Sequence, residues 1–154
     1  MIGYSLLYLP CVSDELIDEV RRAAQNAVDA TKERVGDRLD FSETSLDAIE
    51  EMLAEAAPFV AELPPERVDA LVEQLGSYVL EVGRREFGGR YLWHPGRDAP
   101  VLVVGEPDFR VALLTWDKVR GRLGGDEADN IPFLYGGFAS AARKAGKGVD
   151  ALFV

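Results

Sequence analysis

The stretch LPPERVDALVEQLGSYVLEVGRREFGGRYLWH, residues 63–94, decides the fold. Pro65 begins a helix, because proline is well suited to the first helical position. The apolar residues of this helix form a single stripe less than half the circumference wide: Val68, Leu71, Val72, Leu75, Val79 and Val82. Gly88 and Gly89 end the helix, and the aromatic, alternating residues after them are typical of a strand. The stretch predicts a core helix that leads directly into a sheet.

Gly76 and Gly83 lie near the apolar stripe of this helix. Glycine in a helix interior costs about 1 kcal/mol relative to alanine. We therefore expect a closely packed neighbour at both positions.

Two amphipathic helices are predicted before residue 63. The first begins after Ser13 or Asp14 and ends near Val35, with an alanine-rich apolar stripe. The second begins after Thr44 and is rich in acidic residues outside its apolar face. The apolar segment before them, residues 1–10, is interpreted as a short strand.

Three short strands are predicted after residue 89, at residues 90–95, 100–105 and 109–115. Their short connections favour an antiparallel meander. A short helix at residues 116–123 and a final helix from Ile131 follow, and the apolar tail could add an edge strand. The predicted fold class is α+β: one domain, residues 1–154, with helices packed around a small antiparallel sheet of three or more strands and the third helix central.

The net charge of −10 is unevenly distributed along the chain. Residues 1–65 contain 14 acidic and 5 basic residues, a net charge of −9, whereas residues 66–154 contain 13 and 12, a net charge of −1. Such a field repels a phosphate backbone and attracts a basic partner. We therefore predict a basic protein as the partner, through an acidic face that includes Glu50 and Glu51, and no nucleic acid.

The sequence predicts a cytoplasmic protein that does not bind membranes. Cys11 is the only cysteine, which excludes an intrachain disulfide. No run of about 18 apolar residues predicts a transmembrane helix. The excess of arginine over lysine indicates a bacterial source. The sequence leaves the oligomeric state open, because the apolar segments 2–9 and 149–154 could pair within the monomer or with another chain.

No pattern of residues predicts a catalytic site, a metal site or a cofactor. His94, the only histidine, has a side-chain pKa suited to proton transfer but no catalytic motif around it, which favours a structural role at a strand end. Glu81 is expected outside the apolar stripe and ion-paired with Arg84 and Arg85, whereas Glu86 is expected along the stripe.

The second half of the chain contains the basic residues Arg84, Arg85, Arg90, Arg97, Arg110, Lys118, Arg120 and Arg122. With Trp93 and Trp116 they could bind a carboxylate or phosphate ligand. They could equally balance the acidic helices of the same molecule.

The segments Leu75-Gly76 to Glu81 and Phe87-Gly88-Gly89 to Trp93 resemble a group of small bacterial domains of unknown function. The shared pattern is a Leu-Gly…Glu helix, a Phe-Gly-Gly stop and a tryptophan-bearing strand, and the resemblance covers residues 38–140. Such domains are similar in size and charge to immunity-type proteins of bacterial toxin systems. The resemblance supplies no catalytic residue.

Two functions from different classes follow. The first is a non-enzymatic, cytosolic protein-interaction domain with an acidic face, similar to immunity proteins. The alternative is a small-ligand-binding or enzymatic domain whose pocket is lined by Tyr91, Trp93, His94 and Trp116 beside the arginines.

Overall fold

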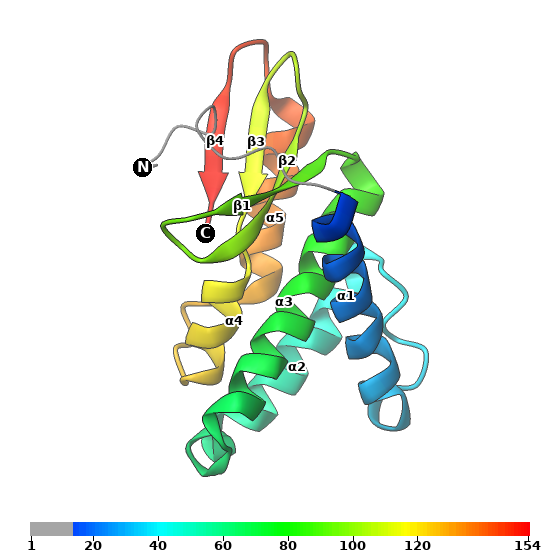
Figure 1. Ribbon diagram of the computed structural model, residues 1–154, viewed down its shortest axis with the longest axis vertical. Coiled ribbons are helices and arrows are strands. Elements are labelled where there is room, and N and C mark those ends of the chain that lie inside the picture. Colours follow the sequence, from blue (N-terminus) through cyan, green and yellow to red (C-terminus); the bar gives the residue numbers. More distant parts are fainter. Residues whose placement is uncertain (1–13) are drawn as a thin grey trace.

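A computed structural model describes residues 14–154. It confirms an α+β fold in which five α-helices pack with one four-stranded sheet (Figure 1). The predicted strand at residues 1–10 and Cys11 lie outside the described residues. The helical elements are α1 (Asp14–Val35), η2 (Glu43–Ser45), α2 (Leu46–Ala56), η3 (Ala57–Glu62), α3 (Pro65–Phe87), α4 (Trp116–Leu123) and α5 (Ile131–Lys144). The strands are β1 (Arg90–His94), β2 (Ala99–Val104), β3 (Arg110–Leu113) and β4 (Asp150–Phe153).

The sheet has the order β1-β2-β3-β4 and is mixed. The predicted antiparallel meander of the first three strands is confirmed. The tail forms the predicted edge strand within the same chain, but β4 pairs with β3 in parallel. The reason is the connection: α4 and α5 carry the chain back to the starting end of the sheet, as a parallel pair requires. Arg110 and Asp150 are register partners and form an ion pair of 2.7 Å across this edge.

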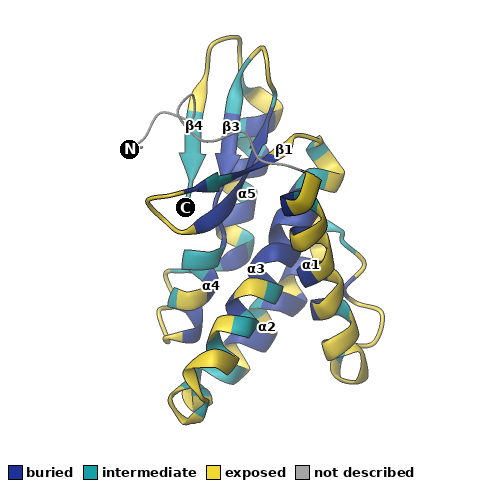
Figure 2. Ribbon diagram, in the orientation of Figure 1, coloured by how far each residue is buried: buried dark blue, intermediate teal, exposed yellow. Residues whose placement is uncertain are grey.

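Helix α3 is the centre of the molecule, as predicted. It packs beside α1, with α2 behind it and the sheet at its C-terminal end (Figure 1). Its N-terminal half buries one face only, but residues 75–83 are all buried (Figure 2). The expectation of a narrow apolar stripe is therefore wrong for the second half, because other elements surround the helix there.

Both helix glycines have the close neighbours expected from the sequence. A Cβ atom at Gly76 would lie 2.5 Å from Cδ1 of Trp116, and one at Gly83 would lie 2.9 Å from Cδ2 of Leu102. The missing side chain at Gly76 thus allows α4 to pack closely against α3, and the one at Gly83 allows β2 to do so. These two approaches bring the helix layer and the sheet together.

Candidate functional site

Glu81 is fully buried in a hydrogen-bonded group that joins α3 to β1. Arg84 donates to both carboxylate oxygens, over 2.6 and 2.9 Å, and the Tyr91 hydroxyl donates to Oε2 over 2.5 Å. Burial acts to raise the pKa of Glu81, but the hydrogen bonds from Arg84 and Tyr91 outweigh it, so this pKa lies below its ordinary value. The ionised carboxylate holds the end of α3 to the first strand.

Arg85 makes a second, longer contact with the same carboxylate. Its Nε lies 3.8 Å from Oε1 of Glu81, and its guanidinium lies 3.5 Å from the centre of the Phe41 ring. The predicted pairing of Glu81 with Arg84 and Arg85 is therefore confirmed. Both oxygens of the Glu81 carboxylate accept hydrogen bonds within this group, so its charge is balanced by its own neighbours.

The burial of Glu81 differs from its expected place outside the apolar stripe. Glu81 is buried, whereas Glu86 is exposed, accepts a hydrogen bond of 2.8 Å from the Tyr135 hydroxyl and pairs with Arg143. A single apolar stripe predicts that the opposite side of α3 faces solvent. Glu81 is buried there, and its partners are Arg84 and Arg85 of the same helix together with the Tyr91 hydroxyl of β1.

Glu50 and Glu51 are neighbours with different environments. Glu50 is largely buried, accepts from Nε of Arg122 over 2.5 Å and accepts from the backbone nitrogen of Ile131 over 3.1 Å. Glu51 is exposed and pairs with Arg38 over 2.8 Å. Glu50 therefore joins α2 to α4 and α5, and it is not part of an open acidic face.

The aromatic residues of the expected pocket do not line one cavity. Trp93 and Trp116 pack edge to face, with ring centres 6.2 Å apart, and the space beside them measures about 20 Å³. His94 follows Trp93 on β1, so its side chain points to the opposite face of the sheet. There its Nδ1 accepts from the backbone nitrogen of Arg97, and burial lowers its pKa below the ordinary value.

The basic residues of the second half balance acids of the same molecule. All eight that the sequence singled out form ion pairs within the chain: Arg84, Arg85, Arg90, Arg97, Arg110, Lys118, Arg120 and Arg122. They do not gather around an anion-binding pocket.

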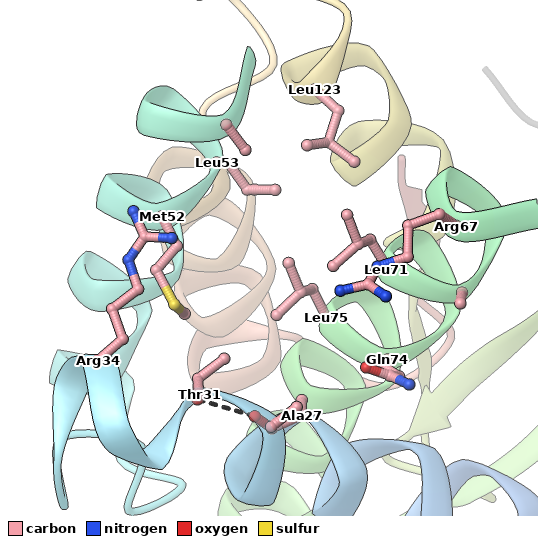
Figure 3. A pocket seen from close by; sticks show the side chains of 13 residues that line it. Ala27, Thr31, Arg34, Met52, Leu53, Arg67, Leu71, Gln74, Leu75 and Leu123 are labelled. Carbon is pink, nitrogen blue, oxygen red and sulfur yellow. Dashed lines mark hydrogen bonds between the residues drawn. The ribbon is translucent and has the colours of Figure 1, made fainter. Parts of the chain in front are cut away.

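A cavity lies among α1, α2, α3 and α4 (Figure 3). It measures about 450 Å³, a volume typical of ligand pockets. Small side chains leave this space open on α1 and on α3. Its apolar lining consists of Ala27, Ala30, Met52, Leu53, Ala56, Ala70, Leu71, Leu75 and Leu123.

Polar side chains lie at the rim of this cavity. Thr31 donates to the backbone oxygen of Ala27 over 2.8 Å, so its hydroxyl proton is used within α1. Arg34 pairs with Glu55. Arg67 forms no ion pair within residues 14–154, and Figure 3 shows its side chain reaching past Leu71 toward the cavity.

Two smaller cavities continue from this one along the seam between α1 and α3. The first, about 170 Å³, shares Ala70 and Gln74 with the large cavity. The second is the space of about 20 Å³ beside the tryptophans, and it shares Glu19 and Glu73 with the first. The row of these three cavities is here called the α1–α3 groove; the large cavity at one end is lined mainly by apolar residues, and the other two are lined by Glu19 and Glu73.

Sequence reasoning missed this groove because its lining comes from four helices. Ala27, Met52, Arg67 and Leu123 are far apart in the chain, and nothing in their spacing connects them. One signal was present: the alanine-rich stripe of α1 indicates a helix that fills little space against its neighbour.

No protein-family model matches the chain, and no curated protein or solved structure matches it either. The resemblance to small bacterial domains of unknown function remains a prediction.

Residues 14–154 contain no helix that is long and apolar enough to cross a bilayer. No group of three or more histidine, cysteine, aspartate or glutamate side chains among these residues could hold a metal ion.

Proposed function

We propose that this protein is a non-enzymatic interaction domain that receives a segment of a partner protein in the α1–α3 groove. The observation that carries the proposal is the row of three cavities along α1 and α3, in which neighbouring cavities share Ala70 and Gln74, and then Glu19 and Glu73. A groove between two helices is a common receptor for an amphipathic segment.

The chemistry of the groove defines the partner segment. The large cavity is apolar and takes aliphatic side chains. At the acidic end, Glu19 and Glu73 are exposed and form no ion pair within the described residues. A segment with an apolar run followed by a basic residue fits this arrangement, whereas a phosphate backbone is repelled.

The acidic residues that we propose for binding lie in the groove and not on α2, because the carboxylates of α2 already form ion pairs within the molecule. Four acidic side chains of the second helical region already pair with arginines: Glu43, Glu50, Glu51 and Glu55. Glu19 and Glu73 form no ion pair within the described residues, which supports their use in binding a partner. The proposal retains the cytoplasmic location, the bacterial source and the immunity-like role expected from the sequence.

A photo-cross-linking residue placed in the groove tests this function. We expect p-benzoylphenylalanine at Ala70, which lines two of the cavities, to capture a defined protein, and the same residue at exposed Glu127 to capture none. With that protein purified, Ala70→Trp should weaken binding by about tenfold or more, because the indole fills the groove. Equal capture at both positions, or unchanged affinity of Ala70→Trp, contradicts the proposal.

A second candidate function is the binding of a small amphipathic anion in the large cavity. The observation that favours it is Arg67, which lacks an ion pair within the described chain and reaches toward an apolar space of about 450 Å³ (Figure 3). Decanoate is a suitable probe. We expect it to raise the unfolding temperature of the wild type, and Arg67→Gln to abolish this increase. A decanoate effect that survives Arg67→Gln argues against carboxylate recognition in this cavity.

A further inference from the structure

Two buried side-chain atoms of residues 14–154 have no hydrogen-bond partner: Oγ of Ser77 and Nε1 of Trp116. Other buried polar side chains are satisfied; for example, Thr115 donates to the backbone oxygen of Gly76 over 2.6 Å. An unsatisfied buried polar atom is costly, and in native proteins it usually marks a bound water or ligand. Both residues line the same cavity of about 20 Å³.

The size and chemistry of this cavity suit one water molecule. A space of about 20 Å³ exceeds the minimum of roughly 10–15 Å³ that a water needs. The indole nitrogen of Trp116 is only a donor, so the group that meets it must accept. The Ser77 hydroxyl can donate or accept. A water accepts from Trp116 and donates to Ser77.

Glu19 and Glu73 stand at the mouth of this cavity, one on each side of the α1–α3 groove. They line both this cavity and the adjoining space of about 170 Å³. The basic residue that lines the adjoining space is Arg22, which forms no ion pair with either carboxylate. Two carboxylates therefore face a space large enough for the end of a side chain.

We propose that this end of the groove is a receptor site for a cationic side chain of the partner, which sits between Glu19 and Glu73 above a water held by Ser77 and Trp116. The inference rests on the interaction function proposed above. The water completes four hydrogen bonds: it accepts from Trp116 and from the cation, and it donates to Ser77 and to a carboxylate. The water in this site supplies a partner for two buried atoms that have none within residues 14–154.

Model peptides with one central arginine, lysine or citrulline between alanines test the site directly. The readout is the NMR spectrum of the indole N–H groups. Trp93 and Trp116 are the two tryptophans of the chain, so the protein has two such resonances, and the one that remains in Trp93→Phe belongs to Trp116. We expect the arginine or lysine peptide to shift the Trp116 resonance and the uncharged citrulline peptide to leave it unchanged. The comparison of arginine with lysine identifies the preferred cation. A shift with citrulline, or none with either cation, overturns the proposal.

Charge variants distinguish a specific cation site at Glu19 and Glu73 from attraction by the overall negative charge of the protein. Glu19→Gln with Glu73→Gln should weaken binding of the cationic peptide by about fivefold or more. Glu33→Gln with Glu66→Gln removes the same charge from exposed positions of α1 and α3 that line none of the three cavities, and should leave binding unchanged. Equal losses in both double variants overturn the site.

Ser77→Ala reports on the water independently of any peptide. If a water bonds to Ser77, the variant loses that bond and unfolds at a lower temperature. If the hydroxyl is unpartnered, its removal relieves a buried polar atom and raises the unfolding temperature, which overturns the proposal.

The site and the interaction function can fail separately. If the peptide shifts the Trp116 resonance but Ala70 gives no cross-link, the cation site is supported and the interaction function is contradicted. If Ala70 gives a specific cross-link but no peptide shifts the Trp116 resonance, the interaction function is supported and the cation site is contradicted.

Discussion

At the scale of single residues, Gly76 controls how closely α4 approaches α3. A methyl group there would lie 2.5 Å from Trp116, whose ring is held against Trp93. We expect Gly76→Ala to reduce the free energy of unfolding by about 1–3 kcal/mol, because the added methyl group forces the indole out of its packed position against Trp93. Chemical denaturation measures this change.

Gly136 provides the matched control in α5. An added Cβ atom meets nothing within 4 Å at this position. Gly136→Ala should therefore stabilise the protein by about 0.4–1 kcal/mol, through the helix preference of alanine and the smaller entropy of the unfolded chain. Destabilisation by both substitutions to a similar extent would show that the Trp116 contact is not the cause.

The buried carboxylate of Glu81 should make stability depend on pH. Its folded-state pKa lies below the ordinary value, so its contribution is complete above the pKa of an unfolded glutamate, about 4.3, and is lost as the pH falls through the folded-state pKa. At pH 7 we expect Glu81→Gln to cost about 1–3 kcal/mol. The difference between wild type and variant should shrink below about pH 4.3. A difference that is constant down to pH 3 contradicts this assignment.

Single positions in α3 show where sequence reasoning succeeds and fails. Close neighbours at Gly76 and Gly83 could be predicted, because glycine in a helix interior needs a reason that lies on the same face. The burial of Glu81 could not, because it depends on Tyr91, which reaches it from β1. Periodicity describes one helix and its solvent side, and it contains no information about a second element on that side.

At the scale of elements, Glu50 is the junction of three helices. Its carboxylate pairs with Arg122 of α4 and accepts from the first backbone nitrogen of α5. Removing one partner of a buried ion pair is strongly destabilising, so we expect Glu50→Gln to cost about 3–5 kcal/mol. Thermal and urea unfolding measure the loss. Charge reversal at Glu50 would disturb the fold, and it cannot test a binding face.

Glu51→Gln is the control for that substitution, one residue further along α2. The ion pair of Glu51 with Arg38 is exposed, and exposed pairs contribute little to stability. We expect a far smaller effect than at Glu50. Similar losses at both positions would mean that α2 is sensitive to any change of charge, and that the junction has no special role.

The elements themselves were predictable, and their arrangement was only partly so. Proline and glycine mark the ends of α3, and alternation with short turns identifies β1 to β3. The parallel pairing of β4 depends on the path of the chain through α4 and α5, which no local pattern records. The α1–α3 groove depends on how far two helices diverge, and this follows from packing alone.

At the scale of the whole molecule, the larger of two hydrophobic clusters joins the helices to the sheet, and the smaller one lies within the sheet region, at Leu92, Ala99, Val101, Val103, Ala112 and Leu114. Residues of all five α-helices and of strands β1, β2 and β3 belong to a single buried cluster. We expect two-state unfolding in urea, with the same midpoint by tryptophan fluorescence, which reports on β1 and α4, and by far-ultraviolet circular dichroism, which reports on the helices. Two different midpoints would show that the chain does not unfold as the single domain predicted from the sequence.

The buried segment of α3, residues 75–83, should also determine the slowest rate of amide hydrogen exchange. Amide protons of a segment surrounded on all sides exchange with solvent deuterium only when the whole molecule opens, whereas those near a one-sided helix end exchange through local fraying. Hydrogen exchange in this run should therefore be the slowest among the described residues. Its rate would give the global stability of the protein under native conditions, without any denaturant.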